Sequence, residues 1–401
     1  MTSLFDAIPL APRDPILGVT EAFNADSRAE KVNLGVGVYY DDQGRIPVLD
    51  SVRQAESELA AKGLPRGYQP IDGLPTYVRA VQELVFGAGA PALLEGRIVT
   101  AQALGGTGAL RLAAEFLRRF HAQATVWISN PSWENHRAIF ESAGFTVEAY
   151  PYYNRDTRGL DFPAMRATLA GLPAGSIVVL HVCCHNPTGA DPDTAQWAEI
   201  IETVRDRGLV PILDLAYQGF ASGLEADAMP VRRFVEAGVP AFVANSFSKN
   251  FSLYGERVGA LSIVAPHADA ATRALSQLKR VVRANYSNPP THGAQVIAAV
   301  LTSPVLRARW EAELAAMRVR IKDMREALVA AVEAAGSNAE FRFVLRQNGM
   351  FSYSGLSPED VARLRDDHGI YAVDSGRICV AALNSSNVAR VGAAVAARLN
   401  A

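Results

Sequence analysis

The residues whose side chains are best suited to catalysis or ligand binding lie at or just after the ends of short apolar runs. Lys249 comes after "VPAFVANSFS", Asp214 lies within "LVPILDLAY", and Asn186 follows "SIVVLHVCC". In open α/β sheets, ligands bind beyond the carboxyl ends of the strands. A lysine at such a place is unusual, because lysine is rarely buried unless it is paired or used in chemistry. We therefore expect an amine, a carboxylate and an amide to meet at one edge of a sheet.

Aromatic and imidazole side chains lie at corresponding points of neighbouring runs. Trp133 and His136 follow "TVWISN", and Tyr217 stands three residues after Asp214. Taken singly, each has an ordinary alternative, since a carboxylate after a strand caps a helix or lies in a solvated turn more often than it catalyses. Trp133 also suits a core and His136 a surface. Together at one edge, these side chains indicate a ligand site.

A helical pattern begins just after Gly105, Gly106 and Thr107, with apolar residues at helical spacing from Leu110 to Phe120. Free N–H groups and the positive end of the helix dipole at such a start favour an anion, above all a phosphate. A Gly-Gly-Thr-Gly stretch is also found as a plain joint between a loop and a helix, and this alternative stays open. By contrast, "GVGVYY" at 35–40 lacks the third glycine and the helix of a dinucleotide site, which argues against a nicotinamide dehydrogenase.

The elements that must position these groups alternate along the middle of the chain. Apolar runs predict strands, and most are separated by amphipathic segments such as "DTAQWAEIIETVRDRG", which closes with a glycine. The predicted strands are residues 125–130, 145–150, 176–184, 209–217, 240–247 and 259–265. Several are apolar throughout, as strands covered on both faces are. This order predicts an α/β fold with a mostly parallel sheet flanked by helices.

The two ends of the chain differ from the middle. The first fifteen residues contain prolines and no period, which predicts an extended arm. Residues 303–336 form one long helical pattern, and we interpret it as a bridge out of the sheet domain. Residues 341–356 and 376–383 then predict strands of a smaller α+β domain.

Composition limits the classes of protein. The 401 residues are 49% hydrophobic and 20% charged, which is typical of a globular chain, and the net charge of −2 gives no reason to expect nucleic acid or an anionic membrane as partner. The three cysteines, Cys183, Cys184 and Cys379, form neither a disulfide framework nor a metal-ligand pattern. The sequence shows no signal peptide and no apolar run of about twenty residues. We therefore expect a cytoplasmic protein without a metal site.

At "SFSKN…ERVG" the chain resembles a family: the class I aminotransferases of the aspartate and aromatic amino acid branch, built on the fold type I scaffold for pyridoxal phosphate. The resemblance covers nearly the whole chain. The motifs that carry it, in matching order, are "VNLGVGVY", "GYQPIDGLP", "GGTGALR", "NPSWENH", "CCHNPTGADP", "LDLAYQGF", "SFSKNFSLYGERVG", "RANYSNPPTHGA" and "NGMFSYSGL". It implies an N-terminal arm at 1–14, part of a small domain at 15–46, a large pyridoxal-phosphate-binding domain at 47–305, and a bridging helix with the rest of the small domain at 306–401.

The resemblance also implies roles for the residues at the strand ends. Lys249 is expected to form the Schiff base with pyridoxal phosphate and then to move a proton between the substrate Cα and the cofactor. Asp214 is expected to pair with the pyridine nitrogen, which keeps the ring an electron sink, and His136 to support that carboxylate. Asn186 and Tyr217 are expected to donate hydrogen bonds to the ring's phenolic oxygen.

The cofactor phosphate is expected at the helix start formed by Gly106 and Thr107, with Ser246 and Arg257 completing the site. The resemblance adds Tyr68, which is expected to reach the phosphate from the second subunit of a homodimer with shared active sites. Gly105 stands where a serine often precedes the Gly-Thr pair in the family. We expect a modest effect of this difference, because backbone N–H groups provide most of the contact.

Substrate contacts are implied in the same way. Trp133 is expected to stack on the cofactor ring, and Arg377 to bind the substrate α-carboxylate through its planar fork, with Asn186 and Gly37 beside it. On the residues alone, Arg377 would be interpreted as a surface arginine at the start of a strand. Arg283 is expected to reach across the dimer to a side-chain carboxylate, which predicts that aspartate, glutamate and their oxo acids are accepted.

Two positions favour wider specificity. The strict aspartate enzymes typically have lysine and threonine where this chain has Tyr40 and Ile46, and the apolar or aromatic replacements favour an aromatic substrate. Neutral drift on a loop is the alternative. The resemblance thus predicts ping-pong transamination, through aldimine and ketimine, between aromatic and dicarboxylic amino acids and 2-oxoglutarate. The alternatives are a strict aspartate aminotransferase, another pyridoxal phosphate enzyme on this scaffold, and a non-catalytic sensor domain that binds the cofactor.

Overall fold

The computed structural model describes residues 3–11, 14, 16–337 and 340–400. Within them, the largest sheet has seven strands in the order β2-β10-β9-β8-β7-β3-β4. Only β10 is antiparallel to its neighbours, β2 and β9, so the sheet is mostly parallel as predicted. The strands are β2 (Ile98–Leu104), β3 (Val126–Asn130), β4 (Val147–Pro151), β7 (Ile177–His181), β8 (Val210–Leu215), β9 (Ala241–Ser246) and β10 (Val258–Val264).

Alternate residues of the central strands enter two separate cores. Along β7, Ile177 and Val179 belong to one hydrophobic cluster, whereas Val178 and Leu180 belong to the other. Successive side chains of a strand point to opposite faces, so a strand that is apolar throughout must be covered on both. Every residue of β7, β9 and β10 is buried, which confirms that interpretation of the sequence.

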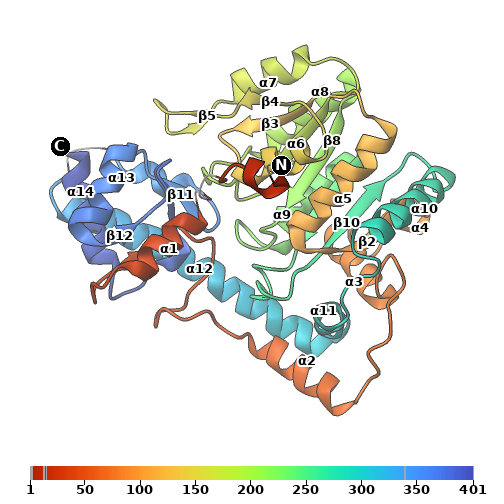
Figure 1. Cartoon of the computed structure of the whole chain (residues 1–401), viewed down its shortest axis with the longest axis horizontal. Helices are drawn as coiled ribbons and strands as arrows, with labels where there is room; N and C mark the ends of the chain where they lie inside the picture. The colour runs from red at the N-terminus through yellow and green to blue at the C-terminus, as the bar shows by residue number, and fades with distance from the viewer. Residues whose placement is uncertain (1–2, 12–13, 15, 338–339, 401) are drawn as a thin grey trace.

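Helices cover both faces of the sheet (Figure 1). One face packs on α5 (Gly105–Phe120), α6 (Glu134–Ser142) and α10 (Ala268–Asn285). The other cluster includes α3 (Pro75–Phe86), α7 (Phe162–Gly171), α8 (Thr194–Arg207) and α9 (Leu224–Glu236). The short α4 (Pro91–Leu94) precedes β2. In α8, Asp193 caps the first turn and Gly208, in the left-handed conformation, ends the last, as the sequence pattern predicts.

A second group of elements lies beside this sheet (Figure 1). It contains α1 (Leu17–Ala25), α13 (Pro358–His368) and α14 (Val388–Leu399), with the short parallel pair β1 (Val32–Asn33) and β12 (Ile370–Tyr371). The antiparallel pair β11 (Phe351–Tyr353) and β13 (Arg377–Cys379) completes it, with η3 (Val380–Ala382) after β13. The long helix α12 (Pro304–Ala334) runs from beside α2 (Asp50–Ala61) and α11 (His292–Thr302) to this group, as the single helical pattern predicts.

Four sequence predictions need correction, and one concerns residues 380–382, which form η3 in place of the end of the strand predicted at 376–383. Residues 98–104 form β2, which the sequence did not indicate as a strand. Residues 342–346, predicted as part of a strand, form the 3-10 helix η2 (Arg342–Arg346). The arm at the N-terminus contains a turn of 3-10 helix, η1 (Leu4–Ala7), in place of a fully extended chain. In the described part of the chain, no helix is both long and apolar enough to span a membrane.

Candidate active site

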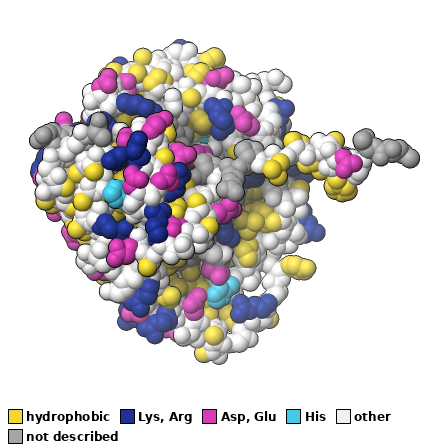
Figure 2. Space-filling view, turned by 60° about the vertical axis from the view of Figure 1, so that its left-hand side comes forward, with side chains coloured by type: hydrophobic (Ala, Val, Ile, Leu, Met, Phe, Trp, Pro, Cys, Tyr) yellow, Lys and Arg dark blue, Asp and Glu magenta, His cyan; other side chains and the backbone are white. Residues whose placement is uncertain are grey.

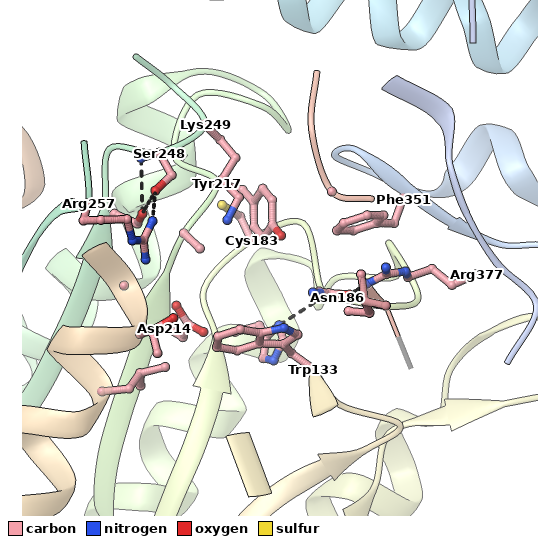
Figure 3. Close-up of a pocket in the computed structure, with 18 residues that line it drawn as sticks. Trp133, Cys183, Asn186, Asp214, Tyr217, Ser248, Lys249, Arg257, Phe351 and Arg377 are labelled. Carbon is pink, nitrogen blue, oxygen red and sulfur yellow. Dashed lines mark hydrogen bonds between the residues drawn. The ribbon is translucent and has the colours of Figure 1, made fainter. Parts of the chain in front are cut away.

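A cavity of about 200 Å³ opens at the carboxyl ends of β7, β8 and β9 (Figure 3). Most of the predicted site residues line it, although they come from segments far apart in the sequence. They are Gly37, Gly106, Thr107, Trp133, Asn186, Asp214, Tyr217, Ser246, Lys249, Arg257 and Arg377. The convergence of these side chains follows from the parallel strands, whose carboxyl ends lie at one edge of the sheet.

Lys249 lies just beyond the end of β9, and its Nζ is 5.0 Å from the centre of the Tyr217 ring. The pKa of Lys249 is lowered to about 8, mainly by burial and also by the nearby positive charges of Arg257 and Arg377, while Asp214 opposes them. In the described residues this amine donates no hydrogen bond. The site therefore holds an amine that loses its proton more readily than a free lysine does.

Asp214 is held by an imidazole that the sequence analysis placed behind it. His136 Nε2 lies 2.9 Å from Asp214 Oδ2, and Ser132 Oγ lies 2.9 Å from the other ring nitrogen, Nδ1. Burial alone would raise the pKa of Asp214, but the hydrogen bond to His136 and the neighbouring positive charges hold it below its usual value. The arrangement keeps a negative charge facing the cavity.

The wall opposite is the start of α5, which begins at Gly105, slightly earlier than the sequence predicted. No side chain caps this helix, so the N–H groups of its first turn remain free for a ligand. Gly105 has φ +69°, and a Cβ built there would lie 2.6 Å from Arg257 Nη2. The left-handed backbone conformation at this position favours glycine.

Two serines complete this wall together with Arg257. Arg257 Nη1 donates to Ser248 Oγ at 3.3 Å, and Ser246 Oγ lies 3.2 Å from Ser248 Oγ (Figure 3). A Cβ built on Gly106 would lie 3.2 Å from Ser246 Cβ, so the helix start and the strand end meet closely. Free N–H groups, hydroxyls and a guanidinium around one hollow suit an anion with several oxygens.

Arg377 forms the far end of the cavity, and its side chain is almost fully buried, at 1% exposure. Nη1 donates to Asn186 Oδ1 at 3.0 Å and Nη2 to the Gly35 carbonyl at 2.6 Å. The guanidinium lies 4.3 Å from the centre of the Phe351 ring, and that ring also packs on Gly37, where a Cβ would be 2.7 Å from Phe351 Cζ. These contacts fix the plane of the guanidinium, with Nε left without a partner in the described residues.

Five predicted site residues do not line the cavity, and one of them, His136, lies behind Asp214. Tyr68 is 95% exposed and Ile46 47% exposed, and Arg283 is also exposed, with a hydrogen bond to Ser287. Tyr40 is half-buried, and its backbone N–H donates to the Ala381 carbonyl beyond β13. Tyr68 and Arg283 were predicted to serve the neighbouring subunit of a dimer, so their distance from the cavity of the same chain agrees with that prediction but does not test it.

Other lining residues were not among the predicted site residues. They include His181, Cys183, Ser248 and Phe351. His181 is the last residue of β7 and pairs in register with Asp214, so its position beside the carboxylate depends on knowing which strands are neighbours. Burial and the charge of His136 lower the pKa of His181 to about 3, against the effect of Asp214.

Comparisons with known proteins agree on one family. The model of the aminotransferases of class I and II matches residues 29–395. The chain is 56% identical to an aspartate aminotransferase of Pseudomonas aeruginosa, covering 98% of this chain and 99% of that protein. It is 51% identical to an aromatic-amino-acid aminotransferase of Escherichia coli, covering 98% and 100%. The crystal structure of an aromatic-amino-acid aminotransferase from Burkholderia pseudomallei, covalently bound to pyridoxal phosphate, is 59% identical and has a TM-score of 0.97, covering 99% and 100%.

Proposed function

This chain belongs to the class I and II aminotransferase family, and we propose that it is a pyridoxal-phosphate-dependent enzyme that transfers amino groups between aromatic or dicarboxylic L-amino acids and 2-oxoglutarate. The observation that carries the proposal is the meeting of Lys249, Asp214 and Arg377 around one cavity. An amine, a carboxylate and a carboxylate-binding guanidinium are the groups that such a reaction needs. A sensor that only binds the cofactor would not need all three.

The residues present fit that cofactor. The uncapped start of α5 and Arg257 offer donors for its phosphate, in a hollow that side chains at positions 105 and 106 would crowd. Asp214 would pair with the pyridine nitrogen, and its lowered pKa favours the ionised form that this needs. Asn186 uses its Oδ1 to accept from Arg377, which leaves Nδ2 free to donate to the phenolic oxygen. Trp133 lies at the cavity wall, where an indole would stack on the ring (Figure 3).

When bound, pyridoxal phosphate supplies an electron sink for the negative charge that develops at the substrate Cα. The residues of the chain position the substrate and transfer its proton. Arg377 binds the α-carboxylate in two places and fixes the substrate with its Cα facing Lys249. The Nζ of Lys249 would take the proton from the substrate Cα and deliver it to the cofactor, and the lowered pKa makes this amine a base near neutrality.

We propose that substrate range depends on residues outside the cavity of the single chain. Tyr40 and Ile46 favour an aromatic side chain, and Arg283, supplied by a second copy, favours a side-chain carboxylate. Strict preference for aspartate is the second candidate, and the 56% identity with an aspartate aminotransferase favours it. The 59% identity with an aromatic-amino-acid aminotransferase favours the broader range.

We further propose a homodimer in which each subunit completes the other's site. Tyr68 and Arg283 face away from the cavity of their own chain, where they could serve a neighbour. The N-terminal arm projects from the body of the protein and carries hydrophobic side chains (Figure 2). Phe5 is 76% and Leu10 99% exposed, which a second subunit would cover.

The domain boundaries implied by the resemblance remain part of the proposal. They are residues 1–14, 15–46, 47–305 and 306–401. Support comes from α12, which leaves the neighbourhood of the sheet and reaches the elements of the second group (Figure 1).

The test begins with the absorbance spectrum of the purified protein, which should show bound pyridoxal phosphate. The kcat/KM values for phenylalanine, tyrosine and aspartate are then measured, each with 2-oxoglutarate. Values for the aromatic substrates equal to or above that for aspartate support the broad range. A hundredfold advantage for aspartate, about 2.7 kcal/mol in transition-state binding, would support the strict enzyme instead. The Lys249→Ala variant should lose turnover with every substrate. Absence of both the cofactor spectrum and turnover would refute the proposal.

A further inference from the structure

A second cavity, also of about 200 Å³, lies apart from the first and shares none of its lining residues. It lies between the hairpin of β5 (Tyr153–Asn154) and β6 (Gly159–Leu160) and the segments that precede α13 and β13. We propose that this cavity binds a phosphate group, either free or on a small organic molecule. The proposal does not depend on the transamination proposed above.

Arg158 provides the first reason, because its charge is half-buried and, among the described residues, has no carboxylate partner. Its guanidinium lies 5.3 Å from the centre of the Phe343 ring and occupies the space that a side chain on Gly355 would fill. Among the described residues, it has no carboxylate within ion-pair distance and donates no hydrogen bond. Placing a charged group away from water is costly unless an opposite charge accompanies it. An anion from solution would supply that charge.

Two further donors border the same cavity. Arg155 is exposed at its rim, and in the described residues it too has no ion-pair partner. The Tyr153 hydroxyl is buried without a hydrogen-bond partner. Burial raises the pKa of Tyr153 to about 12 in spite of the positive charges of Arg158 and Arg155, so this hydroxyl remains able to donate. A buried donor without a partner has a desolvation cost.

The chemistry of these groups favours phosphate. Guanidinium groups match the geometry of phosphate oxygens and bind them through charge-assisted hydrogen bonds. The lining contains one carboxylate, Asp156, which is exposed and forms no ion pair with the two arginines in the described structure. Two cations against one carboxylate leave the lining with a net positive charge, which favours an anionic ligand.

The cavity also lies next to the segment that positions Arg377. Ser375 lines it, and Tyr353, on its wall, pairs in register with Arg377 across β11 and β13. Gly376 is held by Ser354, whose backbone N and Oγ donate to the Gly376 carbonyl at 2.9 and 2.7 Å. A phosphate there would join the β5–β6 hairpin to the turn that precedes Arg377.

The test is calorimetric titration of the cofactor-loaded protein, at constant ionic strength, with inorganic phosphate and with glycerol 3-phosphate. The cofactor occupies the anion site at the start of α5 and so prevents phosphate from binding at that end of the first cavity. We expect one saturable site per chain, and a Kd raised at least tenfold in Arg158→Gln and in Arg155→Gln. Since Arg155 is exposed, its variant keeps the folded structure even if the half-buried Arg158 proves necessary for stability.

The matched control is Arg166→Gln, which removes an exposed arginine that pairs with Glu199 on the same part of the protein. It should bind phosphate as the unchanged protein does. Equal affinity for both probes identifies free phosphate as sufficient, and tighter binding of the ester identifies a phosphorylated molecule. Absence of saturable binding, an unchanged Kd in both Arg155→Gln and Arg158→Gln, or an equal loss in Arg166→Gln would overturn the proposal.

Discussion

Replacing Arg377 with lysine keeps a positive charge at the end of the active-site cavity but removes the planar fork. In the native chain, Nη1 and Nη2 already bond Asn186 and the Gly35 carbonyl, and Phe351 packs against the guanidinium plane. These contacts orient the group for a carboxylate in two-point contact. An ammonium group at the end of a shorter chain cannot make both protein contacts and both ligand contacts.

The size of the effect follows from the hydrogen bonds that a lysine cannot make. A hydrogen bond to a charged group contributes about 1.5–3 kcal/mol. At about 1.4 kcal/mol for each factor of ten, losing one such bond in the transition state lowers kcat/KM roughly 10- to 150-fold. Every substrate has the α-carboxylate that Arg377 is proposed to bind, so kcat/KM should fall by the same factor for phenylalanine and for aspartate.

The assay compares kcat/KM of Arg377→Lys with both amino acids, alongside thermal unfolding. Arg390→Lys is the control, because Arg390 also donates to two carbonyls, those of Glu30 and His368, but lies outside the cavity. A kcat/KM within about threefold of the native value in a folded Arg377→Lys protein would refute the reasoning. So would a loss confined to one of the two substrates.

Three further predictions concern specificity and acid stability. Arg283→Ala should lower kcat/KM for aspartate by at least roughly 30-fold, because an unpaired buried charge costs about 2–5 kcal/mol, and should leave kcat/KM for phenylalanine nearly unchanged. Arg280→Ala, on the exposed side of the same helix, is the control. Equal losses of kcat/KM for both substrates would contradict the role assigned to Arg283. The double variant Tyr40→Lys with Ile46→Thr should shift the ratio of kcat/KM for aspartate to kcat/KM for phenylalanine at least about tenfold toward aspartate. An unchanged ratio would show that these two residues do not determine specificity. His181 has a folded pKa of about 3, mainly because of burial, below the usual value near 6.5 for an unfolded chain, so its contribution to stability is lost as the pH falls through that interval. Urea unfolding at pH 4.5 and 7 should therefore show a smaller decrease in the free energy of unfolding at the lower pH for His181→Asn than for the native protein. An equal decrease in both proteins would exclude this histidine as a cause of the acid destabilisation.

The local sequence pattern was sufficient to predict most strands of the sheet but not β2. The parallel strands are apolar runs that end in polar residues, and both properties can be read from the chain. In β2, Thr100 and Gln102 interrupt the apolar pattern, yet both are buried. Thr100 Oγ1 lies 2.8 Å from Ser262 Oγ on β10, and Gln102 donates to the Pro290 carbonyl at 2.7 Å. The partners that make these polar residues acceptable are remote in sequence, so no window around β2 could indicate them.

Tertiary contact also decided the segment before β11. "FRFVLRQ" is rich in aromatic and aliphatic residues, and the sequence predicted a strand there. The structure has a 3-10 helix there, with Phe343 and Val344 buried. The buried Arg325 of α12 donates to the Val344 carbonyl at 3.3 Å and to the Gly349 carbonyl at 2.7 Å. A helix about twenty residues away in sequence thus sets the backbone that a local pattern leaves undecided.

In the candidate site too, residues at strand ends could be predicted from the sequence, whereas the contacts that join them could not. From Asp214, polar contacts pass to His136 at 2.9 Å, from His136 to His181 at 3.4 Å, and from His181 to the backbone N of Asn186 at 3.2 Å. Asn186 then accepts from Arg377 at 3.0 Å. Four of these five residues could be placed at the site from the sequence and the resemblance, because each follows a strand or matches a motif. His181 could not, since its importance comes from the pairing of β7 with β8. Because the contacts are continuous, substitutions at the cofactor end and the substrate end should not be independent, and their free-energy effects should fail to add.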